Sequence, residues 1–119
     1  MGKTTLVLGA SDRQWSYAYQ AISRLNSHGI KVYGIGKKSI EILGIQIGSE
    51  KIFPDVHTVT MYLNANNQKD YYKYLIRLNP SRVIFNPGSE NPELEGILTQ
   101  HGIHAERACT LVLLGTGQY

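Results

Sequence analysis

Gly9, Ala10 and Ser11 form a run of small residues after the largely apolar residues 4–8, and a helix start at Ser16-Tyr17 follows them. A large side chain in such a turn would block close approach to the backbone. The N-terminus of a helix offers unpaired N–H groups and a partial positive charge, which can hold a phosphate. This order of strand, small-residue turn and helix start predicts a nucleotide site. A tight turn with a purely structural role is the alternative interpretation.

Residue types in this turn and after the second predicted strand help to distinguish NAD from other nucleotide ligands. The dinucleotide fingerprint would place glycines at positions 9, 11 and 14, but Ser11 and Gln14 break it. NAD-binding domains also carry an acidic residue near the end of the second strand, which binds the ribose hydroxyls. Here that place holds Gly36-Lys37-Lys38, and a lysine would attract a phosphate. The pattern disfavours NAD and is compatible with NADP or another phosphorylated ribose, with solvated surface lysines as the alternative.

Few residues have types and spacing suited to catalysis or to metal binding. None of the four histidines has a Cys, Asp or Glu at metal-ligand spacing. His104 lies near Glu106 and Cys109, but nothing marks an oxyanion hole or a group that would orient a base. A small buried cysteine is the simpler interpretation of Cys109. We therefore expect no catalytic residues, no metal site and a protein that binds rather than converts its ligand.

The composition is that of one globular domain. The chain has 119 residues, 42% of them hydrophobic, and no apolar run approaches the roughly 20 residues of a membrane span. One cysteine fits a reducing compartment, so we expect a cytoplasmic protein that does not bind membranes. The net charge is +3, and residues 1–51 carry seven Lys or Arg against three acids. This half suits an anionic ligand, whereas the basic residues are too scattered for nucleic-acid binding.

Hydrophobic periodicity predicts alternating strands and helices. Strands are expected over residues 4–8, 31–35, 57–63, 82–86 and 103–105, with helices over 17–28, 67–78 and from 92 to about 101. Residues 39–55 are expected to be irregular apart from a small edge strand at 51–53, and residues 106–119 to form a tail. The alternation predicts a doubly wound, Rossmann-like α/β domain over residues 1–119. Its sheet should have five mainly parallel strands with helices on both faces.

In such sheets a ligand binds beyond the carboxyl ends of the strands. This rule brings together four loops, at residues 9–16, 36–39, 64–67 and 86–91. From the first three we select the candidate cofactor-binding residues Gly9, Ala10, Ser11, Arg13, Ser16, Tyr17, Gly36, Lys37, Lys38, Asn64, Ala65 and Asn66.

Several segments resemble the small stand-alone CoA-binding proteins, which share the fold of the CoA-binding domain in the succinyl-CoA synthetase alpha chain. The resemblance covers residues 6–11 (LVLGAS), Ser16-Tyr17, residues 28–35 (HGIKVYGI) and residues 42–44 (ILG). It extends to residues 102–110 (GIHAERACT), a last strand followed by a cysteine. It therefore spans nearly the whole chain, although many Rossmann-like domains share the turn itself.

The resemblance implies coenzyme A as the ligand, with its phosphates at Gly9, Ala10, Ser11 and Ser16. The loop at 36–38 would meet the adenosine end, and the loop at 64–66 would flank it. Many family members carry Asn-Pro after the second strand, where this chain has Gly36-Lys37. A lysine there could serve the 3′-phosphate. Succinyl-CoA synthetase activity is not expected, because it needs a phosphorylated histidine from a domain that this chain lacks.

The leading hypothesis is non-catalytic binding of coenzyme A or an acyl-CoA through the Gly-Ala-Ser turn. An NADP-binding or redox-sensing module of the same fold is one alternative. A regulatory subunit with a vestigial nucleotide pocket is another. The apolar tail residues 111–114 are compatible with packing on the core or on a second subunit. A homo-oligomer or a protein partner therefore stays open.

Overall fold

The computed structural model describes residues 2–49 and 51–119. Its strands are β1 (Thr5–Ala10), β2 (Val32–Gly36), β3 (Ile40–Ile42), β4 (Ile45–Gly48), β5 (Thr58–Met61), β6 (Arg82–Phe85) and β7 (His104–Arg107). Within the described residues these strands form one sheet in the order β3-β4-β2-β1-β5-β6-β7, in which only β3 and β4 pair antiparallel. Its helices are α1 (Tyr17–Ser27), α2 (Ala65–Gln68), the 3-10 turn η1 (Lys69–Tyr71), α3 (Tyr72–Leu78), α4 (Pro92–Gln100) and α5 (Thr110–Gly115).

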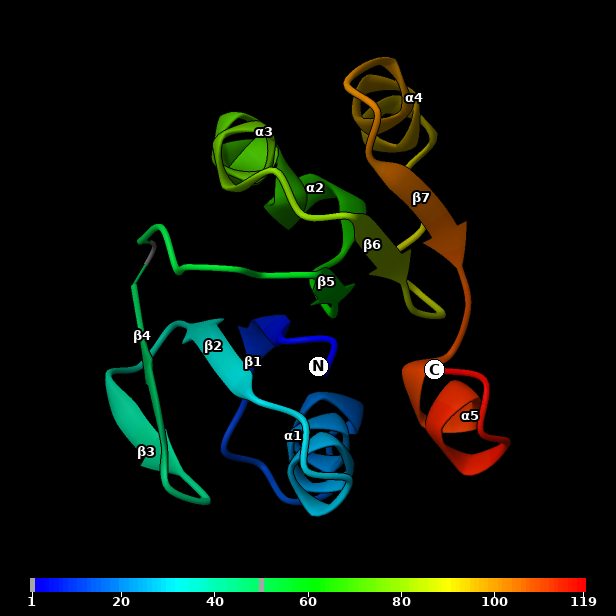
Figure 1. Ribbon diagram of the computed structural model, residues 1–119. Helices are drawn as coiled ribbons and strands as arrows, with labels where there is room; N and C mark the ends of the chain where they lie inside the picture. The colour runs from blue at the N-terminus through cyan, green and yellow to red at the C-terminus, as the bar shows by residue number, and fades with distance from the viewer. Residues whose placement is uncertain (1, 50) are drawn as a thin grey trace.

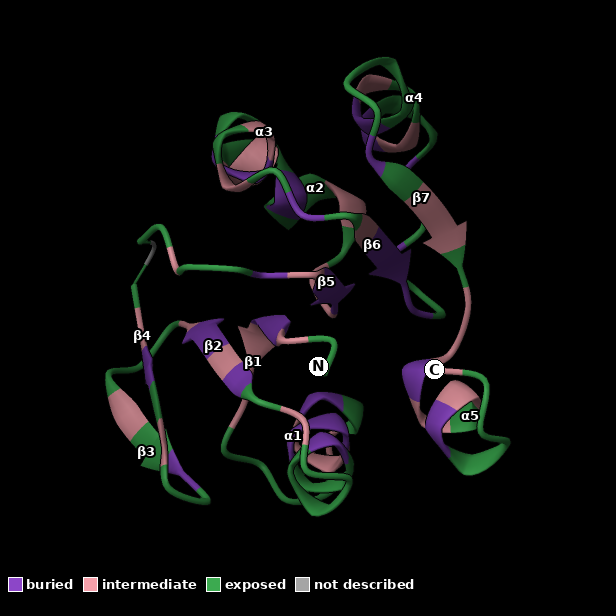
Figure 2. Ribbon diagram, viewed as in Figure 1, coloured by how far each residue is buried: buried purple, intermediate pink, exposed green. Residues whose placement is uncertain are grey.

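Helices cover both faces of the sheet (Figure 1). α1 and α5 lie on one face, and α3 and α4 lie on the other. The apolar residues that repeat at helical spacing in α1 are buried against Val7 of β1: Ala18, Ala21, Ile22 and Leu25. Buried residues follow the strands and the inner sides of the helices (Figure 2). The predicted doubly wound, Rossmann-like α/β fold is confirmed.

The predicted number of strands is wrong, because residues 39–55 are not irregular throughout. They contain the hairpin β3–β4, whose two-residue turn is Leu43-Gly44. Both turn residues have positive φ, 52° and 83°, as a type I′ hairpin turn requires. Leucine seldom adopts that conformation, so the residue types carried no hairpin signal. The predicted edge strand at 51–53 is absent, and Phe53 instead stacks on Tyr33 with 4.3 Å between ring centroids.

Two further elements differ from the prediction. The helix expected over 67–78 begins earlier and is broken into α2, η1 and α3, because Tyr71 leaves the helical region with φ of −108° and ψ of 2°. The tail expected over residues 106–119 contains the end of β7 and the helix α5. Leu114 of α5 is buried in the same apolar cluster as α1, so this segment packs on the core of its own chain.

The pairing of β1 with β2 brings the ends of both strands together. Thr5 to Leu8 pair in step with Val32 to Ile35, and the register then skips Gly9 so that Ala10 lies opposite Gly36. Gly9 has φ of +98°, which favours glycine over any other residue. A Cβ at Gly36 would lie 2.5 Å from the carbonyl oxygen of Ala10. The turn after β1 and the loop after β2 therefore meet at backbone distance.

Tyr119 is bound by a polar cluster at the amino ends of the strands, where β5 and β6 begin. Arg82 donates from Nη2 to the carbonyl oxygen of Tyr119 at 2.8 Å, and its guanidinium lies 4.5 Å from the centre of that ring. Its Nε donates to Thr58 Oγ1 at 2.9 Å, and the same hydroxyl lies 2.7 Å from His57 Nδ1. Burial, together with the positive charges of Arg82 and Lys3, lowers the pKa of His57. The cluster therefore stabilises the neutral imidazole.

We predict that Gly36→Ala lowers the free energy of unfolding by about 1–3 kcal/mol, the usual cost of forcing an extra methyl group into packed structure. The added Cβ would push against the Ala10 carbonyl, which is backbone and cannot rotate away. Gly48→Ala is the matched control, because Gly48 also ends a strand but its Cβ would meet nothing within 4 Å. Urea denaturation of both variants checks the prediction, and equal stabilities would contradict it.

We also predict a pH-dependent stability that comes from His57. Because the folded-state pKa lies below the unfolded value, the unfolded chain takes up a proton first as the pH falls. The free energy of unfolding should therefore decrease below about pH 6.5 and continue to fall until the folded imidazole also titrates. Urea denaturation between about pH 5 and pH 7.5 should show a shallower slope for His57→Gln than for wild type. An unchanged slope would mean that His57 titrates alike in both states.

Candidate functional site

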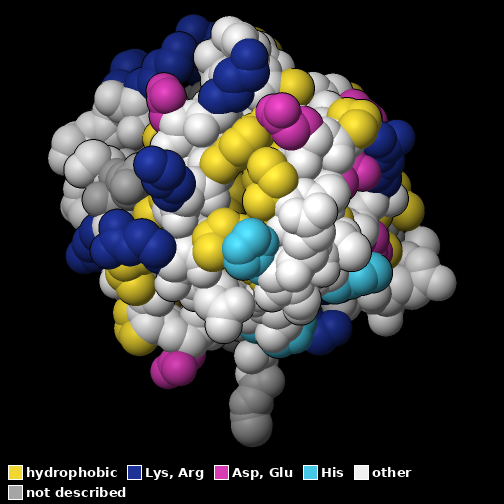
Figure 3. Space-filling model, turned by 90° about the horizontal axis from the view of Figure 1, so that it is seen from above, with side chains coloured by type: hydrophobic (Ala, Val, Ile, Leu, Met, Phe, Trp, Pro, Cys, Tyr) yellow, Lys and Arg dark blue, Asp and Glu magenta, His cyan; other side chains and the backbone are white. Residues whose placement is uncertain are grey.

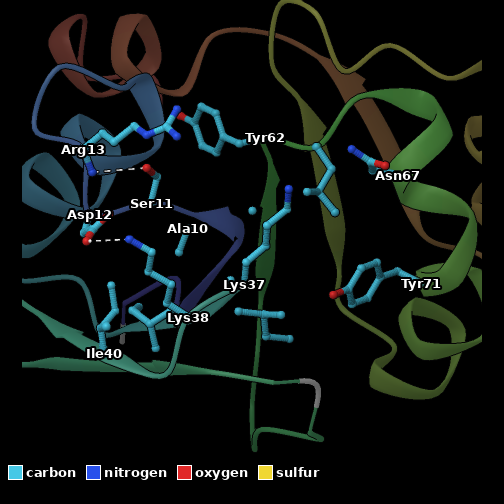
Figure 4. Close-up of a pocket in the computed structure, with 15 residues that line it drawn as sticks. Ala10, Ser11, Asp12, Arg13, Lys37, Lys38, Ile40, Tyr62, Asn67 and Tyr71 are labelled. Carbon is cyan, nitrogen blue, oxygen red and sulfur yellow. Dashed lines mark hydrogen bonds and ion pairs between the residues drawn. The ribbon is translucent and has the colours of Figure 1, made fainter.

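A cavity of about 530 Å³ opens at the carboxyl ends of β1, β2 and β5. This volume lies in the usual range for small-molecule sites. The turn after β1 forms one wall, the loop after β2 and the hairpin β3–β4 form another, and the segment between β5 and α3 closes the third side (Figure 4). The lining residues are Gly9, Ala10, Ser11, Asp12, Arg13, Ile35, Gly36, Lys37, Lys38, Ile40, Ile47, Tyr62, Leu63, Asn67 and Tyr71.

The backbone of the first wall is fixed by local interactions. Ser11 Oγ accepts a hydrogen bond from the backbone N–H of Arg13 at 3.2 Å, which closes the turn on itself. Gly9 lies against Leu63 at the start of the third wall, where a Cβ at position 9 would come within 3.1–3.2 Å of Leu63 atoms. Small residues in this turn therefore leave its backbone accessible from the cavity while the neighbouring strands pack closely.

Charge is concentrated on two of the three walls. Arg13, Lys37 and Lys38 line the cavity, and Asp12 is its one carboxylate among the described residues. The Nζ atom of Lys38 lies 3.6 Å from Asp12 Oδ2, whereas the side chain of Lys37 extends into the middle of the cavity (Figure 4). An excess of positive charge in a concave site raises the local concentration of anions. The cavity is therefore suited to a ligand with more than one negative charge.

The remaining lining is largely apolar. Ile35, Ile40 and Ile47 come from β2 and the hairpin, and Tyr62 and Tyr71 supply aromatic rings from the third wall. Burial raises the pKa of Tyr62 to about 12, so its phenol stays neutral at any physiological pH. Cationic groups at one side and apolar surface at the other together fit an amphipathic ligand, such as one that carries both phosphates and a ring.

Of the twelve predicted binding residues, seven line the cavity: Gly9, Ala10, Ser11, Arg13, Gly36, Lys37 and Lys38. The other five do not. Ser16 caps α1 by accepting from the N–H of Tyr19 at 3.1 Å, and Tyr17 is 70% exposed. Asn64 caps α2 by accepting from the N–H of Asn67, so the cavity meets Asn67 rather than Asn64, Ala65 or Asn66.

The apolar and aromatic residues of the lining were not among those predicted from the sequence. Ile40 and Ile47 belong to the hairpin that we did not expect, and they face each other in its register. Tyr62 and Leu63 directly follow β5, so the rule that ligands bind beyond strand ends could have identified them. Asp12 and Asn67 lie inside the predicted loops but were not selected from them.

The fourth predicted loop, residues 86–91, does not line the cavity. Its polar side chains Asn86, Ser89 and Asn91 are buried and hydrogen-bonded within the protein instead. Asn86 donates to Thr60 Oγ1 and to the carbonyl of Met61, and its Oδ1 accepts from the N–H of Thr110 at 2.8 Å. Asn91 donates to Gln68 Oε1 at 2.9 Å, and Gln68 in turn donates to the carbonyl of Ser89. These hydrogen-bonded side chains therefore fill the space beyond the carboxyl end of β6.

The residues considered for catalysis lie outside the cavity lining. His104 Nε2 lies 3.6 Å from Glu106 Oε1, and Glu106 also approaches Arg82. Cys109 is partly buried and immediately precedes α5. In residues 2–49 and 51–119 no group of three or more His, Cys, Asp or Glu side chains could hold a metal ion. Over the same residues, no helix combines the length and the apolar character that crossing a membrane requires.

Comparison with solved structures supports the fold. The structure is similar over its whole length to the crystal structure of an uncharacterized protein, with 47% identity, a TM-score of 0.96 and 99% of that chain covered. It also resembles a protein from Thermus thermophilus at 20% identity and a TM-score of 0.85, covering 99% of this chain and 91% of the other. A dinucleotide-forming acetyl-coenzyme A synthetase from Ca. Korarchaeum cryptofilum shares the fold at 19% identity and a TM-score of 0.70, covering 87% of this chain and 25% of that one.

No curated protein matches the sequence. A sequence profile of the CoA binding domain does match, over residues 3–115. The match begins before β1, ends in the last helix and so includes every element that lines the cavity. This chain belongs to the CoA binding domain family.

Proposed function

We propose that this protein binds coenzyme A or an acyl-CoA in the cavity beyond β1, β2 and β5, and that it does so without catalysing a reaction. The observation that carries the proposal is the coincidence of the family match with a cation-lined cavity at the Gly9-Ala10-Ser11 turn. Coenzyme A contains a diphosphate and a ribose 3′-phosphate, and three basic side chains at one cavity match that charge.

The walls of the cavity suggest how such a ligand would lie. The turn at Gly9 to Ser11 exposes backbone beside Arg13 and Lys37, which suits the diphosphate. The aromatic and branched side chains of the opposite walls suit the adenine ring, because stacking and apolar contact both favour a planar base. Tyr62 contributes its ring to this lining, while its hydroxyl is directed toward Thr60 and Thr110.

The proposal of a non-catalytic role rests on what lines the cavity. Asp12 is the one acid there among the described residues, and it faces Lys38. The lining has no histidine or cysteine in the described part of the chain. The acetyl-coenzyme A synthetase that shares the fold was solved with phosphate and ADP, but this chain matches only a quarter of it. Its reaction is therefore not carried over.

We predict that coenzyme A binds wild-type protein in a calorimetric titration at fixed moderate salt and that Lys37→Met weakens the binding about tenfold or more, since a charge-assisted hydrogen bond is worth that much. Lys73→Met is the control, because Lys73 is an exposed lysine of α3 outside the cavity lining. Dephospho-CoA and NADPH are titrated in parallel. Tighter binding of NADPH than of coenzyme A, or equal weakening by both variants, would contradict the proposal.

We further predict that acetyl-CoA stays intact in the presence of the protein. A thiol reagent should detect no more free coenzyme A with wild-type protein than with buffer over several hours. Thiol release that increases in proportion to protein concentration, and that Lys37→Met reduces, would instead show a hydrolase or transferase acting at this cavity.

A further inference from the structure

Lys37 and Lys38 are neighbours in the cavity lining, but Lys38 is the one that forms an ion pair with Asp12. Lys38 reaches across from the loop after β2 and pairs with Asp12 of the turn after β1, at 3.6 Å between Nζ and Oδ2. Lys37 comes from the same loop, but its side chain extends toward the opposite wall (Figure 4). The Lys38–Asp12 pair therefore joins the two walls between which the backbone of the Gly9-Ala10-Ser11 turn is accessible.

The Lys38–Asp12 ion pair is weak because both side chains are exposed to solvent. The side chain of Lys38 is 69% exposed and that of Asp12 is 47% exposed, so water screens their attraction. A phosphate group carries more charge than a carboxylate and presents more acceptor oxygens, so it is the stronger partner for an ammonium. Asp12 also places a negative charge within the lining, where it opposes any anionic ligand.

We propose that a phosphate group of the ligand replaces Asp12 as the partner of Lys38, so that Asp12 acts as a built-in competitor that weakens ligand binding. The inference rests on the proposed function, because it concerns the same cavity. Without a phosphate, the carboxylate keeps Lys38 positioned across the walls. With a phosphate bound, Lys38 turns to it, and Asp12 is released to solvent.

The cavity differs in charge from the surface around it. Figure 3 shows a face seen from above the view of Figure 1, where Lys and Arg side chains gather toward the left and upper edges and Asp and Glu side chains lie among them. In the cavity lining, by contrast, Arg13, Lys37 and Lys38 face one carboxylate among the described residues, that of Asp12. Asp12 is therefore the group whose removal should change the anion affinity of this cavity most directly.

The test is a double-variant cycle read by calorimetric titration of coenzyme A. Asp12→Asn should tighten binding about two- to fivefold, the range for loss of an exposed competing ion pair. Glu41→Gln is the matched control, because it removes the same charge from an exposed residue of β3 outside the lining, and it should change affinity less than about twofold. In a Lys38→Met background the gain from Asp12→Asn should shrink by at least half.

Each outcome decides the inference. Tightening that depends on Lys38 supports the exchange. No tightening overturns it, and so does an equal gain with Lys and Met at position 38, because Asp12 would then act only by general repulsion. A titration of dephospho-CoA, which lacks the ribose 3′-phosphate, identifies the phosphate that pairs with Lys38. If Asp12→Asn still tightens binding of dephospho-CoA, the partner of Lys38 is the diphosphate. If the tightening disappears, the partner is the ribose 3′-phosphate.

Inorganic diphosphate tests the pairing of Lys38 with phosphate independently of coenzyme A binding. If wild-type protein binds no coenzyme A, the proposed function fails, and inorganic diphosphate is titrated into the same proteins. The fluorescence of Trp15 offers a second readout, since it is the only tryptophan and lies three residues after Asp12 with 74% of its surface exposed. A gain that depends on Lys38 with diphosphate would then still support the exchange, and its absence would overturn it.

Discussion

The parallel pairing of β1 with β2 is the contact on which the site depends. Its register skips Gly9 and places Ala10 opposite Gly36, where the Ala10 carbonyl leaves no room for a side chain. Two loops that are far apart in sequence therefore leave the sheet side by side. One contributes accessible backbone, and the other contributes two lysines. A residue with a Cβ at position 36 would separate them, and the cationic side chains would no longer surround one volume.

The carboxyl edge of the sheet is divided between an open half and a closed half. Beyond β1 and β2, small residues and long cations leave a cavity. Beyond β6, Asn86 and Asn91 are buried and bonded to β5, α2 and the start of α5. Each of their amide groups has a partner, as buried polar groups need. This network holds the third wall in place, because Gln68 is bonded both to Leu63 of the lining and to Ser89.

Local patterns predicted the parts of the fold that local physics determines. The four buried residues of α1 and the end of α3 at Asn79-Pro80 follow from helical spacing and from the restriction that proline imposes. The hairpin was not predictable, because its turn places Leu43 at positive φ, against its own preference. Of the residues predicted to bind the ligand, Gly9, Gly36, Lys37 and Lys38 line the cavity. Ser16 and Asn64 instead cap helices outside the lining, because a capping residue and a cavity-lining residue look alike in sequence.

The same limit applies to charge. A count of lysines treats Lys37 and Lys38 as equivalent, and only the geometry shows that one faces a carboxylate across the cavity mouth. The distinction matters because a ligand's net attraction depends on the charges it must displace as well as on those it meets. Three cations alone would favour tight retention of any polyanion. One carboxylate among them lowers the gain from each phosphate and leaves more of the selectivity to the apolar walls, which discriminate between rings and chains that carry the same charge.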